Sequence, residues 1–148
     1  MNASVVDVLI VEDNPDDAEL TIRELKKHTN AAKYFHVKDG EEALHFIFGT
    51  GQYAKSRNLA HPPGIVLLDI KMPKVNGIEV LEKIKSDPRT QQIPVVVLTS
   101  SNESPDIKKC YDLGANSYIV KPVHFDDFAA AIKNVGAYWL ILNQNPAK

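Results

Sequence analysis

The chain has 148 residues, of which 44% are hydrophobic and 24% charged, and its formal net charge is −2. This length suits a single domain over residues 1–148, and the composition excludes the disordered and low-complexity classes of protein. With 17 basic against 19 acidic residues, the chain lacks an overall positive field, so we expect neither nucleic acid nor a membrane as a partner.

The first residues, MNASVVDVLIVEDN, resemble neither a signal peptide nor a membrane span. Glu12 and Asp13 interrupt the apolar run before it reaches the length that either would need. Cys110 is the one cysteine of the chain and has no partner for an internal disulfide. These features predict a cytoplasmic protein.

Five short apolar runs predict β-strands. They are rich in β-branched residues and do not alternate with polar ones, which is typical of parallel strands that are covered on both faces. The runs cover residues 5–11, 34–37, 65–68, 93–98 and 118–120.

Segments with helical spacing separate these runs. The first begins at Asn14-Pro15, and the next two are predicted over residues 41–48 and 77–85. A fourth takes Ser104 as its N-cap and ends near Gly114. Strand and helix therefore alternate, which predicts an α/β fold with a doubly wound parallel sheet and helices on both faces.

The fifth helix is the longest, with one apolar stripe that we predict to face the core; it includes Phe125, Phe128 and Trp139. It runs into an extension over residues 136–148, where five consecutive aromatic and aliphatic residues follow one another from Tyr138. These five cannot all face one interior, so we expect an exposed apolar patch that suits a dimer contact.

Residues 49–64 form the one irregular stretch. They are polar, contain Gly, Ser, Asn and two prolines, and are long for a connection in such a fold. We predict a surface loop insertion before the third strand.

Polar side chains follow the predicted strands. Glu12 and Asp13 follow the first, Asp69 the third, Thr99 the fourth and Lys121 the fifth. In an open parallel sheet, ligands bind beyond the carboxyl ends of the strands, where the strand order reverses. If the first and third strands are neighbours, three carboxylates share one small pocket.

Such a pocket indicates a metal site, because like charges at short range are costly to ionise without a cation. Carboxylates without His or Cys partners favour Mg²⁺, or Mn²⁺, over zinc. A phosphoryl group entering the pocket would meet a cation, an ammonium and a hydroxyl. Asp69 could attack its phosphorus while Lys121 and Thr99 contact its oxygens.

These residues resemble the receiver domain of two-component response regulators. The motifs that carry the resemblance are VEDNPDD at 11–17, LLDIKMPKVNG at 67–77, LTSS at 98–101 and YIVKP at 118–122. The resemblance implies a flavodoxin-like sheet of five parallel strands in the order 2-1-3-4-5, with five helices. It also implies a cis peptide bond between Lys121 and Pro122.

The resemblance assigns a role to each site residue. Asp69 would be the phosphoacceptor and, with Glu12, Asp13 and the backbone carbonyl of Lys71, a ligand of Mg²⁺. The Lys71 ammonium could contact the phosphoryl group. Thr99 and Lys121 would form the switch pair, and Tyr118 would turn inward as Thr99 moves, reshaping the surface of the fourth helix, fifth strand and fifth helix.

The insertion at 49–64 and the Tyr138-Trp139-Leu140 segment are similar to those of stand-alone regulators paired with bacterial and cyanobacterial phytochromes. This likeness implies a sensor histidine kinase, of the phytochrome kind, as the phosphoryl donor. With no effector domain expected, the output would pass through a homodimer that uses the switch surface and the Trp139 region, or through a histidine phosphotransfer protein.

Three other functions remain open. An aspartate-nucleophile phosphohydrolase shares the fold class, but usually has a second aspartate where this chain has Lys71. A degenerate receiver would act by constitutive binding. A flavin or nucleotide binder would need a Gly-rich loop after the first strand, where this chain is acidic. We expect a signalling switch whose own chemistry is limited to self-phosphorylation and autodephosphorylation.

Overall fold

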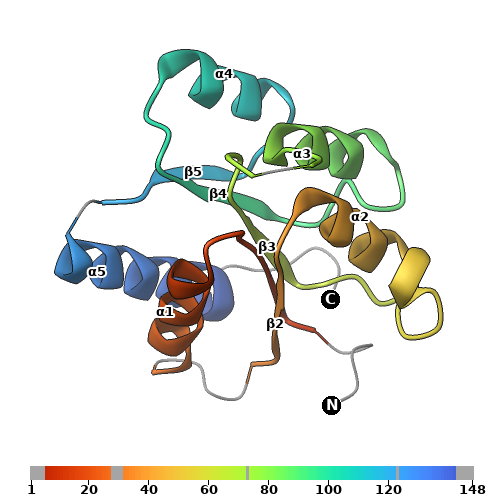
Figure 1. Ribbon diagram of the computed structural model, residues 1–148, viewed down its shortest axis with the longest axis horizontal. Helices are drawn as coiled ribbons and strands as arrows, with labels where there is room; N and C mark the ends of the chain where they lie inside the picture. The colour runs from red at the N-terminus through yellow and green to blue at the C-terminus, as the bar shows by residue number, and fades with distance from the viewer. Residues whose placement is uncertain (1–5, 28–31, 73, 123, 143–148) are drawn as a thin grey trace.

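The computed structural model describes residues 6–27, 32–72, 74–122 and 124–142 (Figure 1). Five strands and five α-helices alternate, with a short 3₁₀ turn after the second helix and a π-helical turn after the last. In chain order they are β1 (Val8–Val11), α1 (Pro15–Lys26), β2 (Tyr34–Val37), α2 (Gly40–Phe48), η1 (Gly51–Tyr53), β3 (Ile65–Leu68), α3 (Gly77–Ser86), β4 (Val95–Thr99), α4 (Ser104–Asp112), β5 (Ser117–Val120), α5 (Phe125–Gly136) and η2 (Ala137–Leu142).

All five strands pair in parallel in the order β2-β1-β3-β4-β5, which confirms the predicted fold. β1 is central to the site because it pairs with both β2 and β3: Val11 lies opposite Val37 on one side and Leu68 on the other. The strand order reverses between β1 and β3. The residues that follow these two strands are therefore neighbours.

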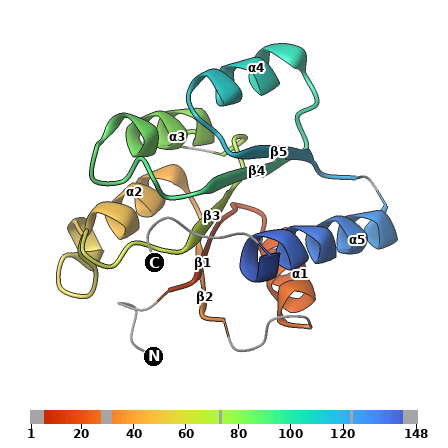
Figure 2. The same cartoon turned by 180° about the vertical axis from the view of Figure 1, so that it is seen from behind.

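Alternate residues of each strand enter two separate cores. Leu9 and Val11 pack with α2, α3 and α4, whereas Val8 and Ile10 pack with α1 and α5. Figures 1 and 2 show this division, with α1 and α5 side by side on one face of the sheet and the other three helices on the opposite face. Both faces are covered, which explains the unbroken apolar runs in the strand sequences.

Local signals fix where most helices begin. Asn14 accepts hydrogen bonds from the backbone N–H groups of Asp16 and Asp17 at the start of α1, at 2.9 and 3.2 Å, and Pro15 fills the first helical position. Asp39 and Asn76 cap α2 and α3 in the same way. This cap thereby fixes the turn after β1, which contains the acidic residues that follow the strand.

Two details of the predicted helices are wrong. The N-cap of α4 is Glu103 rather than Ser104, which is already helical, and no side chain caps this end. Phe125 is 59% exposed, although its neighbour on the predicted stripe, Phe128, is buried. Phe125 is the first residue of α5, and a terminal position can lie beyond the part of a helix that covers the sheet.

β1 and β4 are shorter than their apolar runs. β1 begins at Val8, and Val5, at the start of the predicted strand, lies outside the described residues. β4 begins at Val95, after Pro94, which has no N–H to donate to a neighbouring strand.

Residues 49–64 are mostly exposed, as predicted, but Tyr53 and Arg57 pack against α2. Tyr53 donates a hydrogen bond from its hydroxyl to Glu42 at 2.6 Å and lies edge-on to the Phe46 ring. Arg57 is only 3% exposed, with its guanidinium carbon 4.2 Å from the centre of the same ring and a hydrogen bond to the His61 carbonyl at 2.8 Å. Part of the predicted surface insertion therefore packs against the core.

Replacing Arg57 by Ala is expected to lower the free energy of unfolding by about 2 kcal/mol, because a desolvated cation–π contact and the packing of its alkyl stem are lost together. Urea denaturation measures this difference. Lys55→Ala, an exposed change in the same segment, is the control and should stay within about 0.5 kcal/mol of wild type. Equal stability of both variants would contradict a structural role for the insertion.

The π-helical turn η2 leaves apolar side chains exposed to solvent. Tyr138 is 50% and Ile141 58% exposed, while Trp139 packs partly against the α1 and α5 core. This confirms that the aromatic-aliphatic segment cannot bury every member. Among the described residues, no helix is long and apolar enough to cross a membrane.

Candidate functional site

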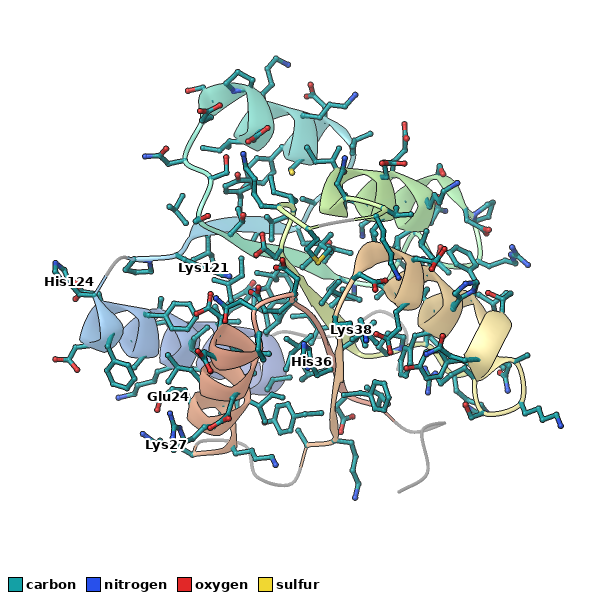
Figure 3. All side chains as sticks on the ribbon, viewed as in Figure 1. Glu24, Lys27, His36, Lys38, Lys121 and His124 are labelled. Carbon is teal, nitrogen blue, oxygen red and sulfur yellow. The ribbon has the colours of Figure 1, made fainter. Side chains whose placement is uncertain are left out.

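The polar residues that follow the strands meet at one edge of the sheet. Asp69, directly after β3, is 6% exposed, and Glu12, directly after β1, is 5% exposed. Thr99 is the last residue of β4 and is fully buried. Figure 3 places Lys121 between the carboxyl end of β5 and α1. All of these residues were predicted from the order of motifs and strands.

Both carboxylate oxygens of Asp69 accept hydrogen bonds. The Thr99 hydroxyl and the backbone N–H of Lys71 donate to Oδ1, at 2.8 and 2.9 Å. The Lys121 ammonium donates to Oδ2 at 3.2 Å. A hydroxyl, an amide and a cation thus all donate hydrogen bonds to the Asp69 carboxylate.

The Lys121 ammonium also contacts two further carboxylates. It donates to Glu12 and, at 3.0 Å, to Oδ2 of Asp17 in the first turn of α1. Burial alone would lower the pKa of Lys121, but the contacts with Glu12 and Asp69 raise it, so the ammonium stays protonated.

Sequence reasoning missed Asp17. The available signal was its place three residues after the helix cap Asn14, a position whose side chain can turn back toward the end of β1. Its presence raises the number of carboxylates around the ammonium and the adjoining acidic cluster from three to four.

Glu12, Asp13 and Asp69 form a candidate cation site. One oxygen from each lies within 4.8 Å of the others, with Asp13 exposed and the other two buried. Hard oxygen donors at this spacing fit a divalent cation such as Mg²⁺ or Mn²⁺. Burial, together with the nearby charge of Asp69, raises the pKa of Glu12 to about 7 despite the opposing effect of Lys121. A bound cation would relieve this repulsion among the carboxylates.

A second set of contacts joins the site to α4. The Tyr118 hydroxyl donates to the Ser101 carbonyl at 2.9 Å, and the Ser101 hydroxyl donates to Asp106 at 2.5 Å. Asp106 is in turn 4.0 Å from the ammonium of Lys71. The side chain of Lys71 therefore leans toward α4, while its backbone N–H stays on Asp69.

The predicted cis bond between Lys121 and Pro122 is wrong, because this peptide bond is trans. The trans form is the lower in energy for an X-Pro bond, by about 0.5–1 kcal/mol, and here it is compatible with the contacts of the site. The backbone N–H of Lys121 still donates to the Thr99 carbonyl at 2.7 Å, and its ammonium still reaches the acidic cluster.

Comparison with known proteins identifies the class to which this arrangement belongs. Residues 8–133 match the model of the response regulator receiver domain. The probable methanogenesis regulatory protein FilR2 of Methanothrix harundinacea is 37% identical over 139 residues, which cover 94% of this chain and 86% of that protein. The response regulator Rcp1 of Synechocystis is 35% identical over 133 residues, covering 90% and 88%.

Two solved structures of response regulators resemble this chain over nearly its whole length. The phosphorylated cyanobacterial phytochrome response regulator RcpA superposes with a TM-score of 0.88 at 36% identity, covering 96% of this chain and 99% of that one. The Mn²⁺-bound form of Rcp1 gives a TM-score of 0.87 at 34% identity, covering 94% and 97%.

The chain belongs to the response regulator receiver family, as its motifs indicated. It is a phosphorelay signalling switch, and its relatives imply a sensor kinase as its partner. The match favours neither the phosphohydrolase nor the degenerate receiver.

Proposed function

We propose that Asp69 accepts a phosphoryl group from the phosphorylated histidine of a sensor kinase. One observation carries this assignment: Asp69 is buried at a strand end, where Thr99 and Lys121 donate to different oxygens of its carboxylate. Those two donors are well placed to move onto the oxygens of an incoming phosphoryl group.

In the transfer, an Asp69 carboxylate oxygen forms a bond to phosphorus while the bond between phosphorus and the donor imidazole nitrogen breaks. The electron pair of that bond returns to the imidazole, which takes up a proton. Thr99 and Lys121 stabilise the negative charge on the phosphoryl oxygens. Dephosphorylation resets the switch: water attacks the phosphorus, Asp69 leaves as a carboxylate, and inorganic phosphate is released.

We assign a divalent cation, Mg²⁺ with Mn²⁺ as an alternative, to Glu12, Asp13 and Asp69, with the backbone carbonyl of Lys71 as a further ligand. The spacing of the three carboxylates supports this, as does the Mn²⁺-bound form of Rcp1. A bound cation supplies positive charge that offsets charge developing on the transferred group.

Thr99 and Tyr118 would report phosphorylation to the surface. Thr99 turning from Asp69 to the phosphoryl group would pull on Ser101, whose backbone carbonyl holds the Tyr118 hydroxyl. Release of Tyr118 would alter the face formed by α4, β5 and α5. This face is where the changed affinity for a partner would arise.

Lys121→Ala is expected to keep divalent cation binding, to slow phosphorylation about 100-fold, and to uncouple the phosphoryl group from the α4-β5-α5 face, since a charged donor in a buried site is removed. Hydrogen exchange of α4 and β5, with and without phosphorylation, measures the coupling. Lys133→Ala, an exposed change on α5, serves as the control. An unchanged exchange response in Lys121→Ala would refute its role in the switch.

We infer that the kinase is of the phytochrome kind, because RcpA, a cyanobacterial phytochrome response regulator, matches nearly the whole chain. We place the exchange in the cytoplasm, where a buried free thiol such as that of Cys110 stays reduced. Phosphotransfer from a radiolabelled phytochrome kinase tests the pairing. Label moving to this chain within seconds supports it; label moving only from kinases of other sensor types would contradict it.

For the output we propose a homodimer. A groove of about 350 Å³ between β5 and α5 is lined in part by Tyr138 and Trp139, and Val120 on the edge strand β5 is 37% exposed. Together with Ile141 these side chains give a self-complementary surface its apolar centre. Light scattering with Mg²⁺ and beryllofluoride should show twice the monomer mass, and Ile141→Glu should return the monomer. A monomer in every state would instead favour transfer to a histidine phosphotransfer protein.

A further inference from the structure

Asp17 has no role in the proposed phosphotransfer, yet its side chain contacts the ammonium of Lys121. The distance from Asp17 Oδ2 to Lys121 Nζ is 3.0 Å, shorter than the 3.2 Å from Asp69 Oδ2 to the same nitrogen. The Lys121 side chain is 10% exposed and that of Asp17 37%, so Asp17 stands at the solvent side of the pair.

A lysine ammonium has three N–H donors. Within the part of the chain that the structure describes, three carboxylates take them up, and they come from three elements: Glu12 after β1, Asp17 on α1 and Asp69 after β3. A phosphoryl oxygen can gain a hydrogen bond from Lys121 only if one of these three carboxylates gives up its own.

Glu12 and Asp69 have other partners available. Both belong to the cluster of carboxylates that fits a divalent cation, whereas Asp17 does not. When Glu12 and Asp69 turn to the cation and Asp69 carries the phosphoryl group, Asp17 is the anion left on Lys121. Before phosphorylation, four carboxylates face one ammonium and one divalent cation, which already leaves one negative charge uncompensated, and the phosphoryl group adds further negative charge beside Asp17.

We propose that Asp17 is a positioning residue that competes with the phosphoryl group for Lys121 and so limits the stability of the phosphorylated state. This inference rests on the proposed function of Asp69. In this role Asp17 sets how firmly Lys121 holds the phosphoryl oxygens, and does not itself contact the phosphorus.

Asp17→Asn removes the competing charge and keeps the side-chain volume. The helix cap is unaffected, because Asn14 is held by the backbone N–H of Asp17 and Thr21 by its carbonyl. Asp16→Asn is the matched control: Asp16 is exposed in the same first turn, carries the same charge, and is not among the Lys121 contacts of the described residues. It reports the general effect of one less anion near the start of α1.

The experiment measures beryllofluoride affinity in the presence of Mg²⁺, by calorimetry, and the lifetime of the phosphoryl group by intact mass. Asp17→Asn is expected to tighten beryllofluoride binding and lengthen the lifetime roughly two- to fivefold beyond the Asp16→Asn control, the range for a partly exposed ion pair. Binding of Mg²⁺ alone should match that control. In a Lys121→Ala background, the Asp17 substitution should have no effect on the lifetime.

An unchanged or shortened lifetime in Asp17→Asn would overturn the proposal. So would an equal effect with and without Lys121, since a merely structural role does not depend on that ammonium. Failure of wild type itself to bind beryllofluoride or to form an adduct would overturn the proposed function, and is thereby distinguishable from failure of the inference.

Discussion

Asp69→Asn is expected to abolish the phosphoryl adduct completely while leaving the fold intact. The amide oxygen can still accept from Thr99 and from the Lys71 backbone, but it is not a nucleophile toward phosphorus. Removing this charge also takes away one of the effects that raise the pKa of Glu12. In buffer without divalent cations we expect the variant to be about 1 kcal/mol more stable than wild type, because repulsion among the carboxylates falls.

Intact mass after incubation with acetyl phosphate and Mg²⁺, with urea denaturation in parallel, measures both effects. Asp112→Asn is the control, since it removes a carboxylate that is 60% exposed on α4. It should label like wild type. An adduct that persists in Asp69→Asn would mean that another residue is the acceptor.

The second large effect is expected at Gly77, the first residue of α3. A Cβ placed there would lie 2.3 Å from the Asp69 carbonyl oxygen and 2.4 Å from the Cα of Ile70, so the backbone itself would have to move. Overpacking that only backbone movement can relieve costs about 2–4 kcal/mol, and we expect Gly77→Ala to lose stability in this range. Because the displaced atoms belong to Asp69 and Ile70, phosphorylation should slow as well.

Gly136→Ala is the matched control in another helix. Its added Cβ would meet only the end of the Leu25 side chain, at 3.0 Å, which can adjust, and Ala favours a helix more than Gly by up to about 1 kcal/mol. We expect its urea midpoint to equal or exceed that of wild type. A Gly77→Ala variant as stable as Gly136→Ala would contradict the tight packing of α3 against the end of β3.

The strands and the polar residues that follow them could be predicted from the sequence, whereas the strand order came from the resemblance to receivers. In a parallel sheet, residues that follow neighbouring strands meet at one edge. Glu12, Asp69 and Thr99 each end a strand or follow it directly, so topology alone brings them together. The apolar runs, covered on both faces, identified the five strands, although β1 and β4 are shorter than the runs that predicted them.

What the sequence did not predict depends on side chains reaching across the fold. Asp17 and Lys121 are 104 residues apart, and only the packing of α1 beneath the loop after β5 brings them into contact. Residues 49–64 were predicted as a surface insertion, yet an aromatic ring of α2 gives the Arg57 guanidinium of this segment a buried partner. Composition cannot reveal such a pairing, because an arginine in a polar segment is in most proteins an exposed residue.

The trans peptide bond at Lys121-Pro122 and the exposed Phe125 share a different cause. Both lie at the junction between β5 and α5, where the backbone conformation depends on how the ends of these two elements pack against the rest of the protein. A family pattern and a helical periodicity describe the interiors of elements better than their junctions.

The central claim is that Asp69 is the phosphoacceptor of a receiver that requires a divalent cation. Its most direct test is the intact mass of the wild-type chain after incubation with acetyl phosphate, with Mg²⁺ and with a chelator. One added phosphoryl group, about 80 Da, labile to base, dependent on Mg²⁺ and mapped to the peptide that contains Asp69, is the expected result. No adduct with Mg²⁺ present, or an adduct on any other residue, would contradict the account.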